Sequence, residues 1–254
     1  MDVNILRINP EKKENIKDVV TDEVILTFYL NEKELLTLLC SPDKLKELCA
    51  GFLFSSGLIN SLNDMENIFI NRKNMTAHIT LKDKDIMPDV LFKRVYTSGC
   101  GRGMLFTNML DLARQKIVTG NTTIQSGKII ELMKAFNKKS IEYKKTGCIH
   151  GAALSDGESI LVMSEDIGRH NAIDKVIGEA LYKNLNMEKL LLITSGRISS
   201  EVMVKVEKMG SAIIVSRGAP TDLAIRLADK WNVTIVGFAR GRRMNVYTAK
   251  ERIV

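Results

Sequence analysis

Residues 190–216 read LLLITSGRISSEVMVKVEKMGSAIIVS, and this stretch decides the fold. Residues 190–194 are an unbroken apolar run, which predicts a strand that is buried on both faces. Ser199 is a suitable N-cap for the amphipathic helix that follows it. Residues 212–215 then form a second apolar strand. Two buried strands joined by a helix are typical of a parallel sheet in an α/β protein.

The same alternation extends in both directions from this stretch. Ser126 is expected to be the N-cap of a helix that begins there, and Asp156-Gly157 to form the turn between two strands. The remaining elements predicted in this half are strands at 149–154 and 160–163, a helix at 169–182, a helix from Pro220 and a strand at 233–236. Residues 125–254 are therefore predicted to form a three-layer α/β/α domain, with the sheet covered on both faces.

The first half of the chain follows a different pattern and is predicted to be a small α+β unit over residues 1–124. Residues 23–40 alternate between apolar and polar, which indicates a hairpin that turns at Asn31. A second hairpin is expected around Lys73-Asn74. Ser41-Pro42 has the sequence of a helix start, with Ser as N-cap and Pro at the first helical position.

Composition narrows the class of protein. The chain has 254 residues, 45% of them hydrophobic and 26% charged, which is ordinary for a globular protein. It has no apolar run long enough to span a membrane and no signal sequence at its start, so a cytoplasmic location is expected. The net charge of +7 favours an anionic partner. Nucleic acid is not expected as the partner, because motifs of nucleic-acid binding are absent from the sequence.

The four cysteines are scattered and include no CxxC pair, which argues against disulfides and a structural zinc site. Cys40, Cys49 and Cys148 are each expected to be buried, reduced thiols. Cys100 differs, because it lies in the glycine-rich segment 97–103, TSGCGRG. An exposed thiol near an arginine has an enlarged thiolate fraction, so Cys100 is the candidate nucleophile.

Three consecutive strands are each followed by a turn that pairs glycine with arginine: Thr194–Arg197, Ser216–Pro220 and Gly237–Arg243. Ligands of open α/β sheets bind beyond the carboxyl ends of the strands. Glycine allows close approach of the backbone, and the arginine fork suits phosphate. These turns predict an anionic ligand at that edge. The alternative is that the arginines pair with carboxylates of neighbouring loops.

Residues 165–175, EDIGRHNAIDK, place many ionisable groups at a junction between a strand and a helix. One interpretation is a polar network that caps the helix, with Asp166 at its start. The other is a set of His, Asp and Arg side chains that lines the ligand cleft, with His170 as the binding residue.

These segments together resemble the FdhD family, the sulfur carriers required for formate dehydrogenase activity. The resemblance covers most of the chain and is closest at residues 146–153, 165–175, 194–197, 216–221 and 237–241. It implies transfer of sulfur from a cysteine desulfurase to a bis-molybdopterin guanine dinucleotide (bis-MGD) cofactor of molybdenum or tungsten. It also implies a homodimer, a formate dehydrogenase apoenzyme as client, and GDP as a mimic of the cofactor.

Cys100 aligns with the first cysteine of the family's Ser-x-Cys-Gly-x-Cys-Gly loop, which carries the persulfide. Gly103 stands where the family has a second cysteine, so an insertion chaperone that binds the cofactor without covalent sulfur transfer remains an alternative. The cofactor-binding residues expected from the turns and from the family segment are Ser195, Gly196, Arg197, Arg217, Gly218, Phe238, Ala239, Arg240, Gly241, Arg242, Arg243 and His170.

The predicted fold is also similar to that of cytidine deaminases, which hold a catalytic zinc. Such a site needs a glutamate two residues after the first ligand, and a Pro-Cys-x-x-Cys segment at the next helix start. His170 is followed by Asn171-Ala172, and residues 195–199 contain no cysteine. The sequence therefore predicts an anion site in place of zinc.

Overall fold

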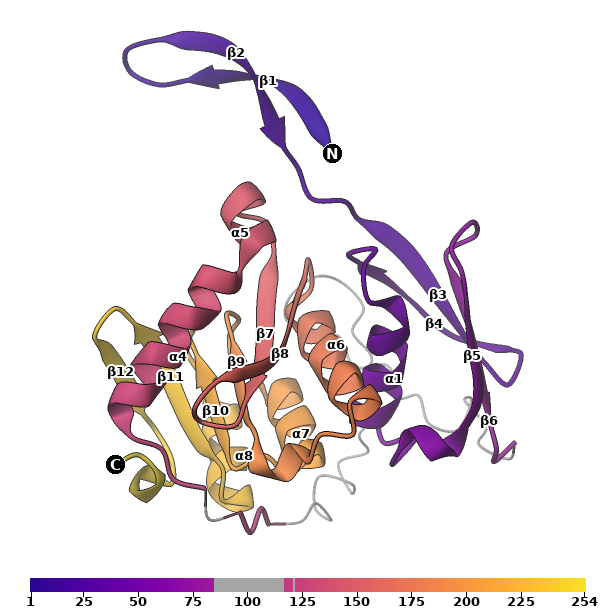
Figure 1. The fold of residues 1–254 in the computed structure, drawn as a ribbon, viewed down its shortest axis with the longest axis vertical. Helices are drawn as coiled ribbons and strands as arrows, with labels where there is room; N and C mark the ends of the chain where they lie inside the picture. Colours follow the sequence, from indigo (N-terminus) through magenta and orange to yellow (C-terminus); the bar gives the residue numbers. More distant parts are fainter. Residues whose placement is uncertain (85–116, 121) are drawn as a thin grey trace.

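A six-stranded sheet forms the centre of the computed structural model, which describes residues 1–84, 117–120 and 122–254. Its strand order is β12-β11-β10-β9-β7-β8 (Figure 1). The strands are β7 (His150–Ser155), β8 (Ile160–Asp166), β9 (Leu191–Thr194), β10 (Ile213–Ser216), β11 (Thr234–Arg240) and β12 (Arg243–Val246). β9, β10 and β11 are parallel, and every residue of β9 and β10 is buried. The expected buried parallel strands and the α/β class are confirmed.

Helices cover both faces of this sheet. The crossovers between parallel strands are α6 (Arg169–Tyr182), α7 (Ser200–Met209) and α8 (Asp222–Trp231), which lie together on one face (Figure 1). Helix α4 (Ser126–Lys139) crosses the other face and buries Ile129, Leu132, Met133 and Phe136. It is followed by the short helix α5 (Ile141–Thr146), which rises above the carboxyl edge of the sheet (Figure 1). The similarity to cytidine deaminases stays a prediction.

The N-terminal half contains a second, four-stranded sheet of order β4-β3-β6-β5. Its strands are β3 (Val24–Leu30), β4 (Lys33–Cys40), β5 (Met65–Asn71) and β6 (Thr76–Leu81). Both expected hairpins are present, and Asn31 adopts the positive φ of 47° that a tight turn requires. Short 3-10 turns occur at Leu62–Asp64, Met187–Lys189 and Lys250–Arg252.

Helix α1 (Leu45–Ser55) joins the two halves, because it packs against the four-stranded sheet on one side and against α6 on the other (Figure 1). Two glycines allow the helix backbones to touch. A Cβ on Gly51 would lie 1.8 Å from the carbonyl oxygen of Asp174, and one on Gly178 would lie 1.9 Å from that of Glu47. The boundary predicted near residue 124 stays a prediction, but the two halves share this interface.

The start of α1 differs from the prediction. Residues 41–44 are not helical, and Lys44 occupies the N-cap position with a left-handed φ of 48°. The Ser41 side chain does not cap the helix, because its hydroxyl accepts a hydrogen bond from the Ile167 amide at 3.2 Å. At α4, Ser126 is the first helical residue and Gln125 is the N-cap. Ser199 is the N-cap of α7, as expected.

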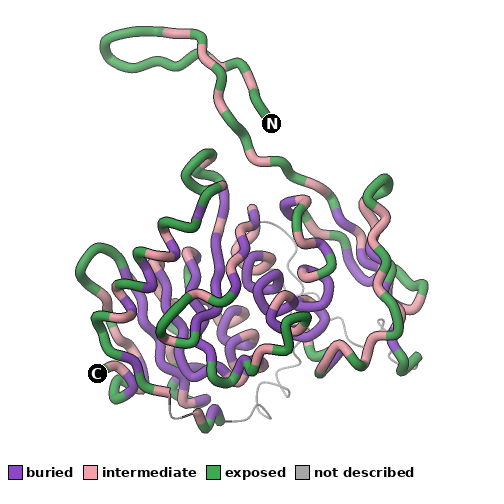
Figure 2. Tube along the Cα trace, viewed as in Figure 1, coloured by how far each residue is buried: buried purple, intermediate pink, exposed green. Residues whose placement is uncertain are grey.

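Residues 1–20 form a hairpin of β1 (Asp2–Ile8) and β2 (Lys13–Val19) that extends away from the rest of the protein (Figure 1). Figure 2 shows that the hairpin is largely exposed, whereas buried residues concentrate in the large sheet, α6 and α1. Among the described residues, no helix has the length and apolar character of a membrane span.

Candidate functional site

The three glycine–arginine turns meet at the carboxyl edge of β9, β10 and β11. Backbone hydrogen bonds connect them in series. The Arg217 amide donates to the Thr194 carbonyl oxygen at 3.2 Å, and the Phe238 amide donates to that of Gly218 at 2.9 Å. The turns are thus held level with one another, and the edge predicted from the sequence is a continuous surface.

Two glycines in these turns allow close contacts, Gly218 with the neighbouring turn and Gly196 with the Arg169 side chain at the start of α6. A Cβ on Gly218 would lie 2.9 Å from the carbonyl oxygen of Gly196, and one on Gly196 would lie 3.0 Å from Cβ of Arg169. The Ser216 hydroxyl donates to the same Gly196 carbonyl at 2.5 Å. A larger residue at Gly218 would push the two turns apart, and one at Gly196 would press on the Arg169 side chain.

In the last segment, Phe238–Arg243, the sequence predicted a turn, but the structure has the end of β11 and the start of β12. Strand β11 continues to Arg240 through an irregularity after Gly237, then turns back into β12, which the sequence analysis missed. Phe238 and Gly241 have positive φ values of 51° and 64°. The Arg240 guanidinium lies 5.8 Å from the centre of the Phe238 ring. Ala239 is buried, so its side chain supports the strand.

Four arginines at this edge are exposed: Arg197, Arg240, Arg242 and Arg243. None of them forms a salt bridge with a carboxylate of residues 1–84, 117–120 or 122–254. The alternative interpretation, in which loop carboxylates neutralise these arginines, is therefore not observed within the described chain. Ser199 adds a further polar group, because its hydroxyl is buried at the start of α7 without a hydrogen-bond partner in that same part of the protein.

His150, which the sequence analysis did not select, belongs to this edge. Strand β7 pairs antiparallel to β9, which places the first residues of β7 beside the ends of the parallel strands. His150 Nδ1 lies 3.3 Å from Ser195 Oγ, and this oxygen accepts a hydrogen bond from the Gly151 amide at 3.0 Å. Burial, followed by the charges of Arg169, His170 and Arg197, lowers the pKa of His150. The imidazole is thus neutral at neutral pH.

His170 lies in the first turn of α6 and faces α7. Its Nε2 is 2.9 Å from Glu201 Oε2, another residue that the sequence analysis missed. Burial lowers the pKa of His170 and outweighs the opposing effect of Glu201. Burial would raise the pKa of Glu201, but the hydrogen bond and charge of His170, with Arg169 and Lys205, bring it below its usual value.

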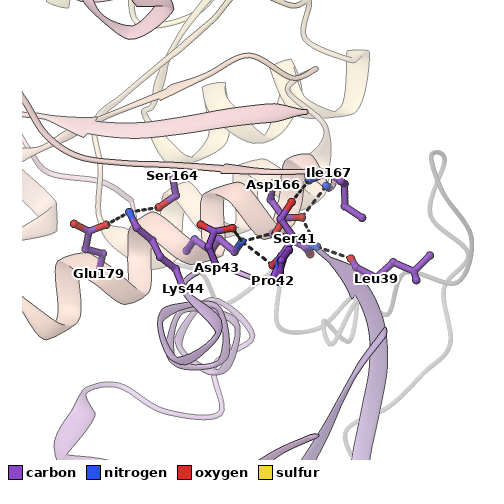
Figure 3. A network of polar contacts seen from close by, with 12 residues as sticks. Leu39, Ser41, Pro42, Asp43, Lys44, Ser164, Asp166, Ile167 and Glu179 are labelled. Carbon is purple, nitrogen blue, oxygen red and sulfur yellow. Dashed lines mark hydrogen bonds and ion pairs between the residues drawn. The ribbon is translucent and has the colours of Figure 1, made fainter. Parts of the chain in front are cut away.

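Asp166 and Lys175, two further polar residues of the segment 165–175, belong to a buried network rather than to a ligand surface. Lys175 Nζ lies 2.7 Å from Asp166 and 3.1 Å from Asp43. Figure 3 shows Asp166 next to Ser41 and Asp43. Asp166 also accepts hydrogen bonds from the Ser41 amide at 3.1 Å and the Asn171 side chain at 2.9 Å. This network connects the segment before α1 to the start of α6, which supports the interpretation as a polar network for these residues.

Cys100, the predicted nucleophile, lies outside the described residues. Cys40 and Cys49 are buried, as expected, and burial raises the pKa of Cys40 to about 12 and that of Cys49 well above its usual value. The prediction for Cys148 is wrong, because this thiol is exposed. Helix α5 ends at Thr146 and β7 begins only at His150, so Cys148 lies in the short connection between them.

The chain is similar to known proteins over almost its full length. Residues 21–254 match the model of the FdhD/NarQ family. The sulfur carrier protein FdhD of Bacillus pumilus is 39% identical over 93% of this chain and 90% of that protein. The one from Staphylococcus aureus is 38% identical over 98% of this chain and 95% of that protein.

A solved structure also matches in fold. It is the crystal structure of a chain assigned as a formate dehydrogenase accessory protein from Desulfotalea psychrophila. The two structures superpose with a TM-score of 0.82 over 100% of this chain and 99% of that one, at 24% identity. The family match and the identity to curated relatives lead to one conclusion: the chain belongs to the FdhD/NarQ family.

Proposed function

We propose that this protein is a sulfur carrier that receives persulfide sulfur from a cysteine desulfurase on Cys100 and delivers it to a bis-MGD cofactor of molybdenum or tungsten. The cofactor is bound as substrate at the edge formed by residues 195–197, 217–218 and 238–243. Formate dehydrogenase apoenzyme is the client. The proposal includes action in the cytoplasm as a homodimer.

The observation that carries the proposal is the group of exposed arginines at the carboxyl edge of the parallel strands. They lack carboxylate partners in the described chain and share this edge with the unsatisfied hydroxyl of Ser199. A phosphate group satisfies both, since it accepts charge-assisted hydrogen bonds from guanidinium and neutral ones from hydroxyl groups. The names of the curated relatives support the sulfur chemistry.

The first transfer is a thiolate attack on a sulfane sulfur. The Cys100 thiolate attacks the outer sulfur of the desulfurase persulfide, and the bond between the two sulfurs of the desulfurase breaks. Its electron pair stays on the desulfurase cysteine, while the outer sulfur and its proton move to Cys100. On delivery the new sulfur–sulfur bond breaks and Cys100 leaves as thiolate, while the outer sulfur keeps its proton and is transferred as hydrosulfide. The reduced metal of the substrate cofactor would supply the two electrons that this reduction requires.

Residues of the described edge have binding roles in this scheme. Arg197, Arg217, Arg240, Arg242 and Arg243 hold the phosphates of the dinucleotide. The neutral side chain of His150 offers a hydrogen bond close to those phosphates without adding charge. His170 lines the same binding site from the first turn of α6, where its Nε2 lies 2.9 Å from Glu201 Oε2.

The test is labelling with cysteine that carries radioactive sulfur, in the presence of a cysteine desulfurase. Wild-type protein is expected to acquire label that a reductant removes, and the Cys100→Ala variant to acquire none. Cys148→Ala is the matched control, because it removes an exposed thiol and should leave labelling intact. Label on the Cys100→Ala variant equal to that on wild type would refute the role of Cys100.

Gly103 supports a second candidate function, that of an insertion chaperone without covalent sulfur transfer. It stands where the family loop has a second cysteine, so the resolving thiol is missing. A chaperone that only inserts the cofactor would bind GDP and support formate dehydrogenase activity without carrying label. The two functions are separated by complementation. Cys100→Ala fails to restore formate dehydrogenase activity in a deletion strain if sulfur transfer is required, and restores it if the protein is a chaperone alone.

A further inference from the structure

Arg217 differs from the other arginines of the edge, because its guanidinium is hydrogen-bonded to residues of two helices, α4 and α5. Nη1 of Arg217 donates to Asn137 Oδ1 of α4 at 3.1 Å. Nη2 donates to the Tyr143 hydroxyl of α5 at 3.4 Å. The guanidinium carbon also lies 5.0 Å from the centre of the Tyr143 ring, within the range of a cation–π contact.

Helix α5, which has only six residues, is itself fixed in place by Glu165 at the end of β8. The two carboxylate oxygens of Glu165 accept hydrogen bonds from the amides of Glu142 and Tyr143, each at 3.0 Å. A carboxylate at the start of a helix satisfies amides that have no partner within the helix. Glu165 therefore sets the position of Tyr143, and Tyr143 sets that of Arg217.

Neither Asn137 nor Tyr143 belongs to the buried hydrophobic core. Tyr143 is 37% exposed, and Asn137 is only partly buried on the polar side of α4. A guanidinium carries more N–H donors than these two contacts use, so Arg217 retains donors for an anion. Freezing a long side chain costs conformational entropy, and a fork that is already oriented avoids this cost when the ligand binds.

We infer that Asn137 and Tyr143 are positioning residues that orient Arg217 for a phosphate of the guanine nucleotide. This inference rests on the proposed function, because it requires an anionic nucleotide at the carboxyl edge. It adds α4 and α5 to the site, and it explains why a polar face of two helices converges on one arginine. Glu165 is also a positioning residue, because its hydrogen bonds to the first turn of α5 hold Tyr143 in place.

The experiment is calorimetric titration of the full-length protein with GDP at fixed ionic strength. Tyr143→Ala and Asn137→Ala are each expected to raise the Kd by roughly fivefold to tenfold, since each frees the Arg217 side chain. Tyr143→Phe retains the ring contact and should stay within about twofold of wild type. Tyr182→Ala is the matched control: its ring is similarly exposed but lies at the end of α6, and its Kd should equal that of wild type.

A double-mutant cycle separates positioning from a general effect on folding. In an Arg217→Ala background, Tyr143→Ala should weaken GDP binding no further, because the residue that it orients is gone. An equal loss in both backgrounds, or no loss in the single variant, would overturn the inference and leave the proposed function standing. If wild-type protein itself fails to bind GDP, the proposed function and the inference both fall.

Discussion

Lys175 and Asp166 form an ion pair at 2.7 Å in which neither side chain has any exposed surface. The pair connects α6 to the end of β8, and it also holds the segment before α1 through Ser41 (Figure 3). Removing Lys175 leaves the Asp166 carboxylate buried without its cationic partner.

Lys175→Met should therefore lower the free energy of unfolding by about 3–5 kcal/mol, as expected for a broken buried ion pair. Urea denaturation measures this loss. Lys128→Met is the matched control, because Lys128 pairs with Glu158 at 2.7 Å on the surface and its loss should cost only about 0–1 kcal/mol. Equal losses in the two variants would show that the buried pair does not hold the halves together.

Because α1 and α6 are in close contact, substitution of alanine for two different glycines should change the stability of the protein in opposite directions. Gly178→Ala places a methyl group against the Glu47 carbonyl and should cost about 1–3 kcal/mol or more. Gly127→Ala, in a helix position with nothing within 4 Å, should stabilise the protein by about 0.5–1 kcal/mol. Thermal unfolding of the two variants tests both signs. A neutral Gly178→Ala would mean that the helices are further apart than described.

The described cysteines should differ in how readily their thiols react with an alkylating reagent. In a Cys100→Ala background, Cys148 should react with iodoacetamide under native conditions, because it is exposed. Cys40 and Cys49 should react only after unfolding, since burial raises the pKa of both thiols. Peptide mass spectrometry locates the label. Native labelling of Cys40 that matches that of Cys148 would contradict the described burial.

The two histidines of the edge predict how stability changes with pH. Burial is the main reason why the pKa of His150 and that of His170 lie below the usual 6.5. Below about pH 6.5 the unfolded chain takes up protons that the folded protein resists, so the free energy of unfolding falls as the pH decreases. The stabilisation is fully present above that pH.

Urea denaturation from about pH 7 to about pH 5 tests this sign, and the His150→Gln/His170→Gln variant should show a shallower slope. NMR titration of the ring protons should place both pKa values below 6.5. An unchanged slope in the double variant would assign the pH dependence to other groups.

Much of the fold could be predicted because local patterns and tertiary contacts agree. Helix α6 was predicted with the observed bounds of Arg169 and Tyr182, and the turn at Asn31 was found from alternation alone. The start of α1 could not be predicted, because the hydroxyl of Ser41 bonds to Ile167, far away in sequence. Its preference as an N-cap is overridden by the contact between the two halves.

The site was predicted in outline and not in its supporting residues. Glycine next to arginine after a strand is a local signal, so the three turns could be recognised. His150, Glu201 and Tyr143 join the edge only through strand pairing and helix packing, which no local pattern reports. Cys148 was expected to pack because it stands next to a predicted strand, but it lies in the connection between the six-residue helix α5 and β7.

In the proposed function, sulfur on Cys100 passes to a cofactor held by the arginines at the carboxyl edge of β9, β10 and β11. The most direct measurement is a chase experiment, in which protein loaded with radioactive sulfur is mixed with bis-MGD and the label on each component is counted. Label is expected to leave wild-type protein for the cofactor and to stay on the Arg197→Ala/Arg217→Ala variant. Equal transfer from both proteins, or none from wild type, would contradict it.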